Sequence, residues 1–141
     1  MNILVINGPN LNLLGIRETK IYGYESLDEI MTWLENSIEG SNHNFKFYQS
    51  NSEGDLINIM QDERQWANGI LINAGALSHY SYAIADTITS IKVPTVEIHL
   101  SDTDNREKFR KKSVLKDVCI NTIKGLGKHS YLEGLKYLEN I

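Results

Sequence analysis

The chain has 141 residues, of which 41% are hydrophobic and 23% are charged, and only two prolines, so its composition is that of an ordinary folded domain. Fourteen Lys and Arg against eighteen Asp and Glu give a net charge of −4, which disfavours nucleic acid as a partner. The single Cys119 excludes an internal disulfide framework, and no apolar run approaches the roughly eighteen residues that span a membrane. We therefore expect one domain over residues 1–141, located in the cytoplasm and without a membrane segment.

Short apolar runs rich in β-branched residues predict five strands, each separated from the next by a segment of helical character. Pro94 lies near the start of the fourth run, where a missing backbone donor matters least. The predicted strands are residues 2–6, 45–49, 69–72, 93–99 and 118–123.

Four segments have apolar side chains at the three- to four-residue spacing of amphipathic helices. The first begins with a capping box from Ser26 to Glu29, includes Ile38 in its apolar stripe and ends at Gly40. The predicted helices cover residues 26–40, about 53–67, 78–90 and 131–138.

The alternation of strands and helices indicates βαβ units with right-handed crossovers and a parallel sheet that is covered on both faces. Five strands in this length of chain suggest an α/β, flavodoxin-like three-layer fold with sheet order 2-1-3-4-5. In such open sheets, ligands bind beyond the C-terminal ends of the strands where the strand order reverses. We therefore expect the functional site between the first and third strands.

Two polar segments leave the first and third strands at that edge. The first runs over residues 7–24, much longer than the usual two- to six-residue connection, and its several Leu and Ile residues are too apolar for a solvated linker. We interpret it as a lid over about residues 8–24, the alternative being a flexible surface loop. The second segment covers residues 73–79 and is also rich in glycine and polar side chains.

Common nucleotide-binding and metal-binding motifs do not match the chain. No G-x-G-x-x-G follows the first strand, and the run from Gly125 to His129 lacks the upstream glycine and the Ser or Thr of a Walker loop. Asp102 and Asp104 begin like a calcium loop, but Arg106 occupies the third ligand position. We therefore expect no cofactor and no metal.

Six short motifs are distributed over almost the whole chain: 8–17 (GPNLNLLGIR), 22–23 (YG), 49–54 (QSNSEG), 73–79 (NAGALSH), 97–101 (EIHLS) and 106–110 (REKFR). In their order and spacing they resemble the motifs of type II 3-dehydroquinate dehydratase. The resemblance implies a flavodoxin-like fold and a homododecamer built as a tetramer of trimers. It also implies a cofactor-independent hydro-lyase of the shikimate pathway that removes water from 3-dehydroquinate, in an anti elimination through an enolate, to give 3-dehydroshikimate.

The residues themselves are suited to that reaction. Loss of water beta to a ketone requires a base for the alpha proton, stabilisation of the enolate and an acid for the departing hydroxyl. A phenol is a weak base at neutral pH, but a nearby cation favours the phenolate, and Arg17 lies five residues before Tyr22. Tyr24 competes for this role, and the family motif decides for Tyr22. Glu97 and His99 share one face of a strand, so the carboxylate can orient the imidazole and favour its charged, acidic form.

The resemblance also implies which other residues bind substrate. Several of them have an ordinary structural explanation when taken alone, since Asn beside Gly is common in turns. Backbone donors of Leu100 and Ser101 would receive the carboxylate; Asn10, Asn73 and His79 would recognise hydroxyls and position a water beside the enolate; Arg110 would hold ring hydroxyls; and Asp86 would reach a neighbouring subunit's site.

The chain departs from the family pattern at positions that are not catalytic. Ala74 replaces a usual Pro, Leu77 a usual Tyr, Ser52 a usual His, and Lys111 with Lys112 a usual pair of His. We expect these changes to affect the pocket rim and subunit contacts. Two rival interpretations are a non-catalytic flavodoxin-like module that binds FMN or a small anion, and an enzyme for another hydroxy-ketone acid.

Overall fold

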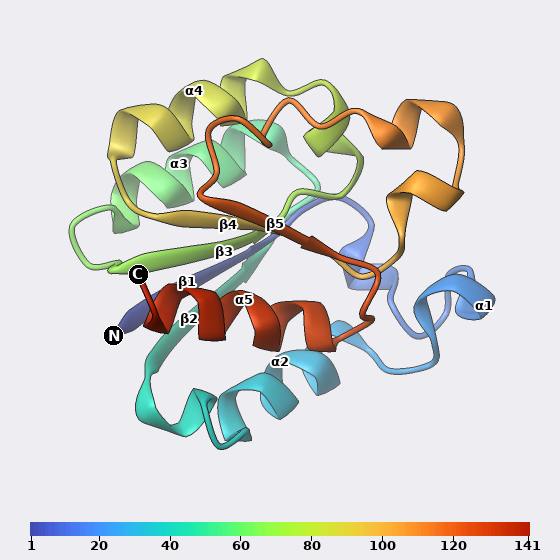
Figure 1. The fold of residues 1–141 in the computed structure, drawn as a ribbon, viewed down its shortest axis with the longest axis horizontal. Helices are drawn as coiled ribbons and strands as arrows, with labels where there is room; N and C mark the ends of the chain where they lie inside the picture. Colours follow the sequence, from blue (N-terminus) through green and yellow to red (C-terminus); the bar gives the residue numbers. More distant parts are fainter.

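The five strands of the sheet run parallel, in the order β2-β1-β3-β4-β5 (Figure 1). The computed structural model describes residues 1–141. The predicted fold class and strand order are confirmed. The strands are β1 (Asn2–Asn7), β2 (Asn44–Gln49), β3 (Gly69–Asn73), β4 (Thr95–His99) and β5 (Asn121–Lys124).

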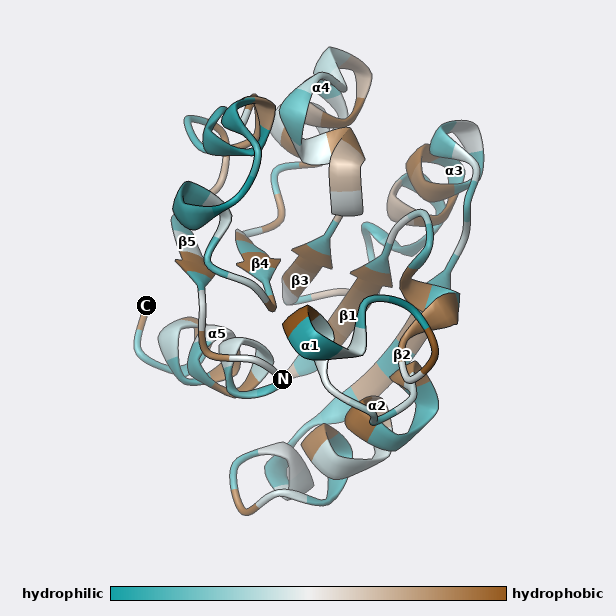
Figure 2. Ribbon diagram, turned by 90° about the vertical axis from the view of Figure 1, so that its right-hand side faces the viewer, coloured by the Kyte–Doolittle hydropathy of each residue, from teal (hydrophilic) through white to brown (hydrophobic).

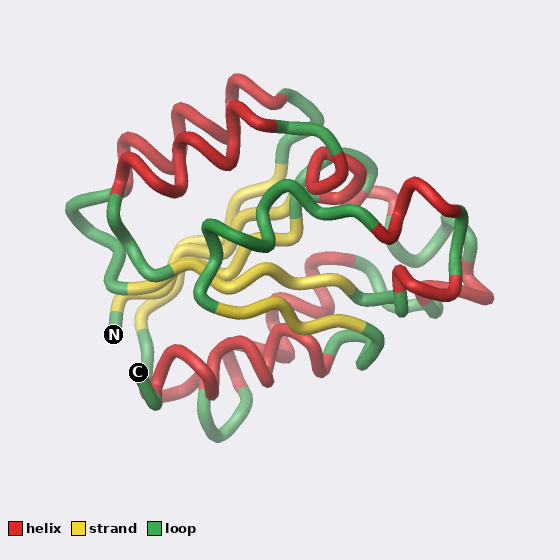
Figure 3. Tube along the Cα trace, turned by 45° about the horizontal axis from the view of Figure 1, so that its top comes forward, coloured by secondary structure: helices red, strands yellow, loops and turns green.

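Helices lie on both faces of the sheet (Figures 1 and 3). A fifth helix, α1, is only four residues long and lies at the end of the molecule opposite the two termini (Figure 1). None of these helices is long and apolar enough to cross a membrane. The helices on one face are α3 (Glu53–Glu63) and α4 (Tyr82–Ile91), those on the other are α2 (Leu27–Asn36) and α5 (His129–Glu139), and α1 is Thr19–Tyr22. Short 3₁₀ turns occur at Leu11–Leu13, Gly40–Asn42, Gly75–His79, Thr103–Asn105 and Lys108–Lys111.

The side-chain alternation of β1 divides the core into two parts. Ile3 and Val5 pack with the apolar faces of α2 and α5, whereas Leu4 and Ile6 pack with those of α3 and α4. Figure 2 shows the hydrophobic strands enclosed between the helical layers. Because both faces are buried, β1 and β3 carry continuous apolar runs that end only where the polar loops begin.

Three predicted helices are longer than the observed ones. α2 ends at Asn36, and Ile38, which was predicted on its apolar stripe, is 86% exposed. α3 ends at Glu63, so the buried Ala67 follows the helix rather than belonging to it. The helix predicted from residue 78 begins at Tyr82, because a 3₁₀ turn precedes it and Ser81 caps its first turn. The fourth and fifth strands also begin two and three residues later than predicted, at Thr95 and Asn121.

The loops after β1 and β3 meet at the edge where the strand order reverses. Asn7 and Asn73, the last residues of the two strands, are paired in register. Directly after them, a Cβ atom on Gly8 would lie 2.5 Å from the carbonyl oxygen of Ala74, so only glycine allows the two backbones to approach this closely. The predicted lid, residues 8–24, folds as a 3₁₀ turn followed by α1 rather than as an open loop.

Candidate active site

A cavity opens at the C-terminal edge of the sheet, as the topology predicted. The space between its walls is about 510 Å³ when the open mouth is included. Its walls come from the loops after β1, β3 and β4, from α1 and from the segment 103–110. Nine of the eleven predicted site residues line it: Asn10, Arg17, Tyr22, Asn73, His79, His99, Leu100, Ser101 and Arg110.

The phenol of Tyr22 lies between two guanidinium groups. Nη2 of Arg17 is 3.4 Å from the Tyr22 hydroxyl, and the centre of this guanidinium is 4.5 Å from the ring centroid. Arg106 donates a hydrogen bond to the same hydroxyl from Nη1, and its guanidinium centre lies 5.3 Å from the ring. Two guanidinium groups thus contact one phenol oxygen from different segments of the chain. The predicted proximity of Arg17 to Tyr22 is thus present in the structure.

Arg106 is the residue that the sequence reasoning missed. Its side chain is only 9% exposed, and its Nη2 atom is buried without a hydrogen-bond partner. A buried guanidinium nitrogen in this state is suited to an oxygen atom of a bound anion or hydroxyl. The residue begins the 106–110 motif and is also the misfit in the calcium-like loop, but neither pattern assigns it a place beside Tyr22.

Glu18 is the anionic neighbour of this arginine pair. Its carboxylate oxygen Oε2 is 3.1 Å from Nη2 of Arg17 and 3.7 Å from Nη2 of Arg106. The residue has a φ angle of 36°, in the left-handed region that non-glycine residues rarely adopt. Since its side chain is 48% exposed, solvent screens its charge, and the site beside Tyr22 keeps a net positive character.

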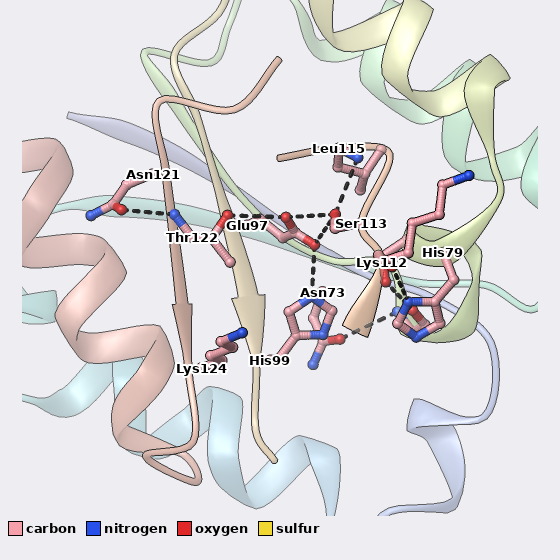
Figure 4. A network of polar contacts seen from close by, with 12 residues as sticks. Asn73, His79, Glu97, His99, Lys112, Ser113, Leu115, Asn121, Thr122 and Lys124 are labelled. Atoms are coloured by element: carbon pink, nitrogen blue, oxygen red, sulfur yellow. Dashed lines mark hydrogen bonds and ion pairs between the residues drawn. The ribbon is translucent and has the colours of Figure 1, made fainter. Parts of the chain in front are cut away.

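His99, in the cavity wall, pairs with Glu97, which is buried behind it (Figure 4). Nε2 of His99 is 2.7 Å from Oε2 of Glu97, which leaves Nδ1 of the imidazole for the cavity side. Glu97 is completely buried and lies behind His99 rather than in the cavity wall. Burial alone would raise the pKa of Glu97, but the hydrogen bond and charge of His99, together with two neighbouring hydroxyl groups, outweigh it and lower the pKa.

His79 stacks beside His99 in the same wall, with ring centroids 6.4 Å apart and ring planes within 10° of parallel. Its Nδ1 donates to the backbone carbonyl of Lys112 at 2.7 Å, which fixes the tautomer and leaves Nε2 as an acceptor. Burial lowers the pKa of His79; the carbonyl opposes this effect, and the charges of His99 and Arg110 reinforce it. His79 is therefore suited to accept a hydrogen bond as a neutral ring.

Asn73 is held by a chain of buried hydrogen bonds that begins in the core. The hydroxyl of Tyr131, on α5, accepts from Nδ2 of Asn73 at 3.1 Å and donates to Oδ1 of Asn7 at 2.5 Å. The other end of the Asn73 amide accepts from the backbone N–H of Gly75 at 3.3 Å. Because both ends of the amide have partners, its orientation at the cavity wall is fixed.

Asn10 is positioned through its backbone. It has a φ angle of 70°, and its N–H donates to Oδ1 of Asn51 at 3.0 Å. Gln49, at the end of β2, donates to the same Asn51 oxygen and to the carbonyl of Gly8. The motif at residues 49–54 therefore supports the loop that carries Asn10, although it does not line the cavity.

Two predicted residues lie at or beyond the rim. Arg110 lines the cavity while its Nε is 2.5 Å from Oε2 of Glu107. Asp86 is an exposed residue of α4 and does not line the cavity of its own chain. No group of three or more His, Cys, Asp or Glu side chains is arranged to hold a metal ion.

The departures from the family pattern have local structural roles. Ser52 caps α3 by accepting from the N–H of Asp55, while Ala74 and Leu77 are buried in the core. At Lys112 it is the backbone carbonyl that binds His79, so replacement of the side chain leaves that contact available.

Comparisons with known proteins agree with this geometry. The family model of class II dehydroquinases matches residues 1–139. A 3-dehydroquinate dehydratase of Trichodesmium erythraeum is 48% identical over 139 residues, which cover 99% of this chain and 93% of that protein. The crystal structure of a type II dehydroquinase from Butyrivibrio crossotus matches with a TM-score of 0.95 at 42% identity, covering 99% of this chain and 97% of that one. One from Propionibacterium acnes matches with a TM-score of 0.92 at 34% identity, covering the same shares. With the sheet order, the motifs and the cavity all in agreement, the chain belongs to the class II dehydroquinase family.

Proposed function

We propose that this chain is a 3-dehydroquinate dehydratase that eliminates water from its substrate through an enolate. Its family and its relatives of that name support the assignment. The observation that carries the proposal is the Tyr22 phenol held by Arg17 and Arg106 in the same cavity as the His99–Glu97 pair. One group is thus arranged to take a proton and the other to give one.

In the first step, the Tyr22 phenolate removes the proton alpha to the ketone. The C–H bond breaks, its electron pair becomes the enolate, and the phenol holds the proton. The two guanidinium groups beside the Tyr22 ring lie close to the negative charge of this step and can stabilise it. Asn10 and a water that it positions, which the family resemblance implies, would stabilise the enolate oxygen.

In the second step, the enolate electrons re-form the ketone and expel the hydroxyl at the beta carbon. His99 donates a proton from Nδ1 to this hydroxyl, so water leaves, and Glu97 stabilises the imidazolium that precedes the transfer. Proton exchange with solvent then restores His99 and Tyr22. This route uses side chains and water only, so we propose that the enzyme needs no cofactor and no metal.

Substrate recognition depends on the remaining groups in the cavity wall. Leu100 and Ser101 follow directly after His99, so their backbone can receive the substrate carboxylate at the end of β4. The hydrogen-bonded amide of Asn73 and the neutral His79 ring suit hydroxyl groups. Arg110 would bind ring hydroxyls once it shares or leaves its contact with Glu107.

We further propose that the working form is a homododecamer, a tetramer of trimers, in which Asp86 of one subunit reaches the site of the next. Exposed aromatic rings beside the cavity support a subunit contact there: Tyr80, Tyr82 and Phe109 are 63%, 62% and 55% exposed. Sedimentation should give a mass far above that of a monomer, and Asp86→Ala should weaken both assembly and substrate binding. A fully active monomer would contradict this part of the proposal.

The proposed function is tested by following two reactions of 3-dehydroquinate in D₂O by NMR: deuterium incorporation at the alpha carbon and formation of the unsaturated product. Tyr22→Phe keeps the ring but removes the base, so we expect both reactions to fall by about 10²-fold or more. His99→Ala removes the acid, so exchange should continue while product formation stops.

Tyr24→Phe is the matched control, because Tyr24 lies two residues away on the same segment but is 80% exposed and does not line the cavity. It should retain activity. Exchange that persists in Tyr22→Phe would mean that the base lies elsewhere. A wild-type protein that binds 3-dehydroquinate but never forms the product would instead favour the binding-module interpretation.

A further inference from the structure

The Glu97 carboxylate is surrounded by more donors than its histidine partner supplies. The Ser113 hydroxyl lies 2.9 Å from Oε1 and 2.7 Å from Oε2, and the Thr122 hydroxyl lies 3.1 Å from Oε1 (Figure 4). With Nε2 of His99, three side chains therefore donate to one fully buried carboxylate.

These two hydroxyl groups come from segments outside the loops that form the substrate cavity. Ser113 follows the 3₁₀ turn at Lys108–Lys111, and Thr122 lies on β5, where it is the register partner of Glu97. The backbone N–H of Leu115 donates to the Ser113 hydroxyl oxygen at 3.1 Å, which directs the hydroxyl proton toward the carboxylate. Neither residue lines the cavity that holds Tyr22.

We infer that Ser113 and Thr122 are positioning residues that keep Glu97 ionised, so that the proton of the His99–Glu97 pair stays on the imidazole, where it can be delivered to the departing hydroxyl. This inference rests on the proposed dehydration. It assigns to these two residues a role in the second chemical step only, because neither of them approaches Tyr22 or its arginines.

The need for such donors follows from the state of the pair after proton transfer. When His99 has given its proton to the departing hydroxyl, the imidazole is neutral and no longer balances the buried negative charge. A buried carboxylate without partners is strongly disfavoured and would take a proton instead. Two fixed hydroxyl donors keep the carboxylate satisfied at that moment, and His99 is then recharged from solvent.

Other charged groups near Glu97 do not replace these donors. His79 and Cys119 interact with its charge at longer range, and burial together with that charge raises the pKa of the Cys119 thiol to about 12, so the thiol stays neutral. A second cavity, which Glu97, Ser113 and Thr122 also line, brings three lysines to this region, but none of them makes a hydrogen bond to Glu97: Lys111, Lys116 and Lys124.

The test uses the double variant Ser113→Ala, Thr122→Val, which removes both hydroxyls with little change in side-chain shape. We expect product formation to fall at least tenfold while deuterium exchange at the alpha carbon stays within about twofold of wild type, because only the acid is affected. The single variant Ser113→Ala should show a smaller change of the same kind, and Thr122→Ser should retain wild-type behaviour. If the double variant does not fold, the rates of product formation and deuterium exchange in these single variants test the inference instead.

Thr95→Val is the matched control. Thr95 is a buried residue two positions before Glu97 on the same strand, and its hydroxyl donates to the carbonyl of Val93 at 2.9 Å rather than to Glu97. This variant loses one buried hydrogen bond but should keep the ratio of exchange to dehydration. Equal losses of both reactions in the Ser113 and Thr122 variants, or a ratio no different from that of Thr95→Val, would overturn the inference.

A second measurement does not depend on activity. In protein labelled with ¹³C at glutamate carboxyl groups, the Glu97 resonance should report an ionised carboxylate at pH 6 in wild type and a partly or fully protonated one in the double variant. An ionised Glu97 in both proteins would overturn the inference even if activity changed. Failure of the wild-type protein to dehydrate 3-dehydroquinate would refute the proposed function and leave this spectroscopic result standing.

Discussion

Tyr131→Phe should destabilise the fold by about 2–6 kcal/mol although it removes a single oxygen atom. Tyr131 is completely buried, and its hydroxyl has two partners, Oδ1 of Asn7 and Nδ2 of Asn73. Phenylalanine fills almost the same volume, so packing is preserved. Each buried amide that loses its partner costs about 1–3 kcal/mol, and here two amides are affected.

Urea denaturation at one fixed protein concentration measures this change, because association of subunits would otherwise alter the apparent stability. The midpoint should fall while the slope stays constant. Tyr137→Phe is the control: Tyr137 is on the same helix, but it is 39% exposed and its hydroxyl is 3.5 Å from the Ile120 carbonyl. It should change stability by less than about 0.5 kcal/mol. A similarly small loss in Tyr131→Phe would refute the reasoning and mean that Asn7 and Asn73 pair directly with each other.

Three further predictions concern charge, backbone packing and pH. Arg106→Ala should reduce alpha-proton exchange by about 10²-fold, since the phenolate loses its most buried cation, with partial recovery in Arg106→Lys; unchanged exchange rates in the NMR assay would contradict this role. Gly8→Ala should lower the free energy of unfolding by about 1–3 kcal/mol because the new methyl group meets backbone, whereas Gly54→Ala, with no atom closer than 3.9 Å, should be tolerated in the same urea titration. Because the pKa of His79 is lowered by folding, the unfolded chain binds a proton there more readily, so stability should be constant above about pH 7.5 and decrease as the pH falls from about 7 to 5. In His79→Gln, the free energy of unfolding should decrease less over this pH range than in wild type. Identical pH profiles of stability for wild type and His79→Gln would exclude His79 as the source of the decrease.

Strand periodicity and topology rules were sufficient to predict the sheet order and the position of the cavity. This succeeded because both faces of β1 and β3 are buried, so each of these two strands is a continuous apolar run that ends abruptly at a polar residue, Asn7 or Asn73. Helix ends were predicted less well. Ile38 has the right spacing for the stripe of α2, but the helix ends two residues earlier and leaves this side chain in solvent.

The contacts within the site also differ in how far the sequence predicts them. Arg17 and Tyr22 are close in sequence, so their contact could be predicted from spacing. Arg106 is 84 residues from Tyr22, and only the fold brings the two side chains together. The hydroxyls of Ser113 and Thr122 had no signal in the sequence, because isolated Ser and Thr residues are common on any surface and nothing local relates them to Glu97.

The hydrogen bond between Tyr131 and Asn7 joins residues that are 124 positions apart, and this has a consequence for the timing of biosynthesis. β1 is made before the other strands but lies inside the sheet, between β2 and β3, so it waits for both of these neighbours. At about 5–20 residues per second, a ribosome needs roughly 6 to 25 s to travel from Asn7 to Tyr131. Throughout this interval the polar end of β1 has no partner from α5, and the walls of the cavity are not yet joined. The nascent chain therefore cannot complete its catalytic pocket before α5 has been made, and until then its unpaired strand edges are the surface that a chaperone must shield.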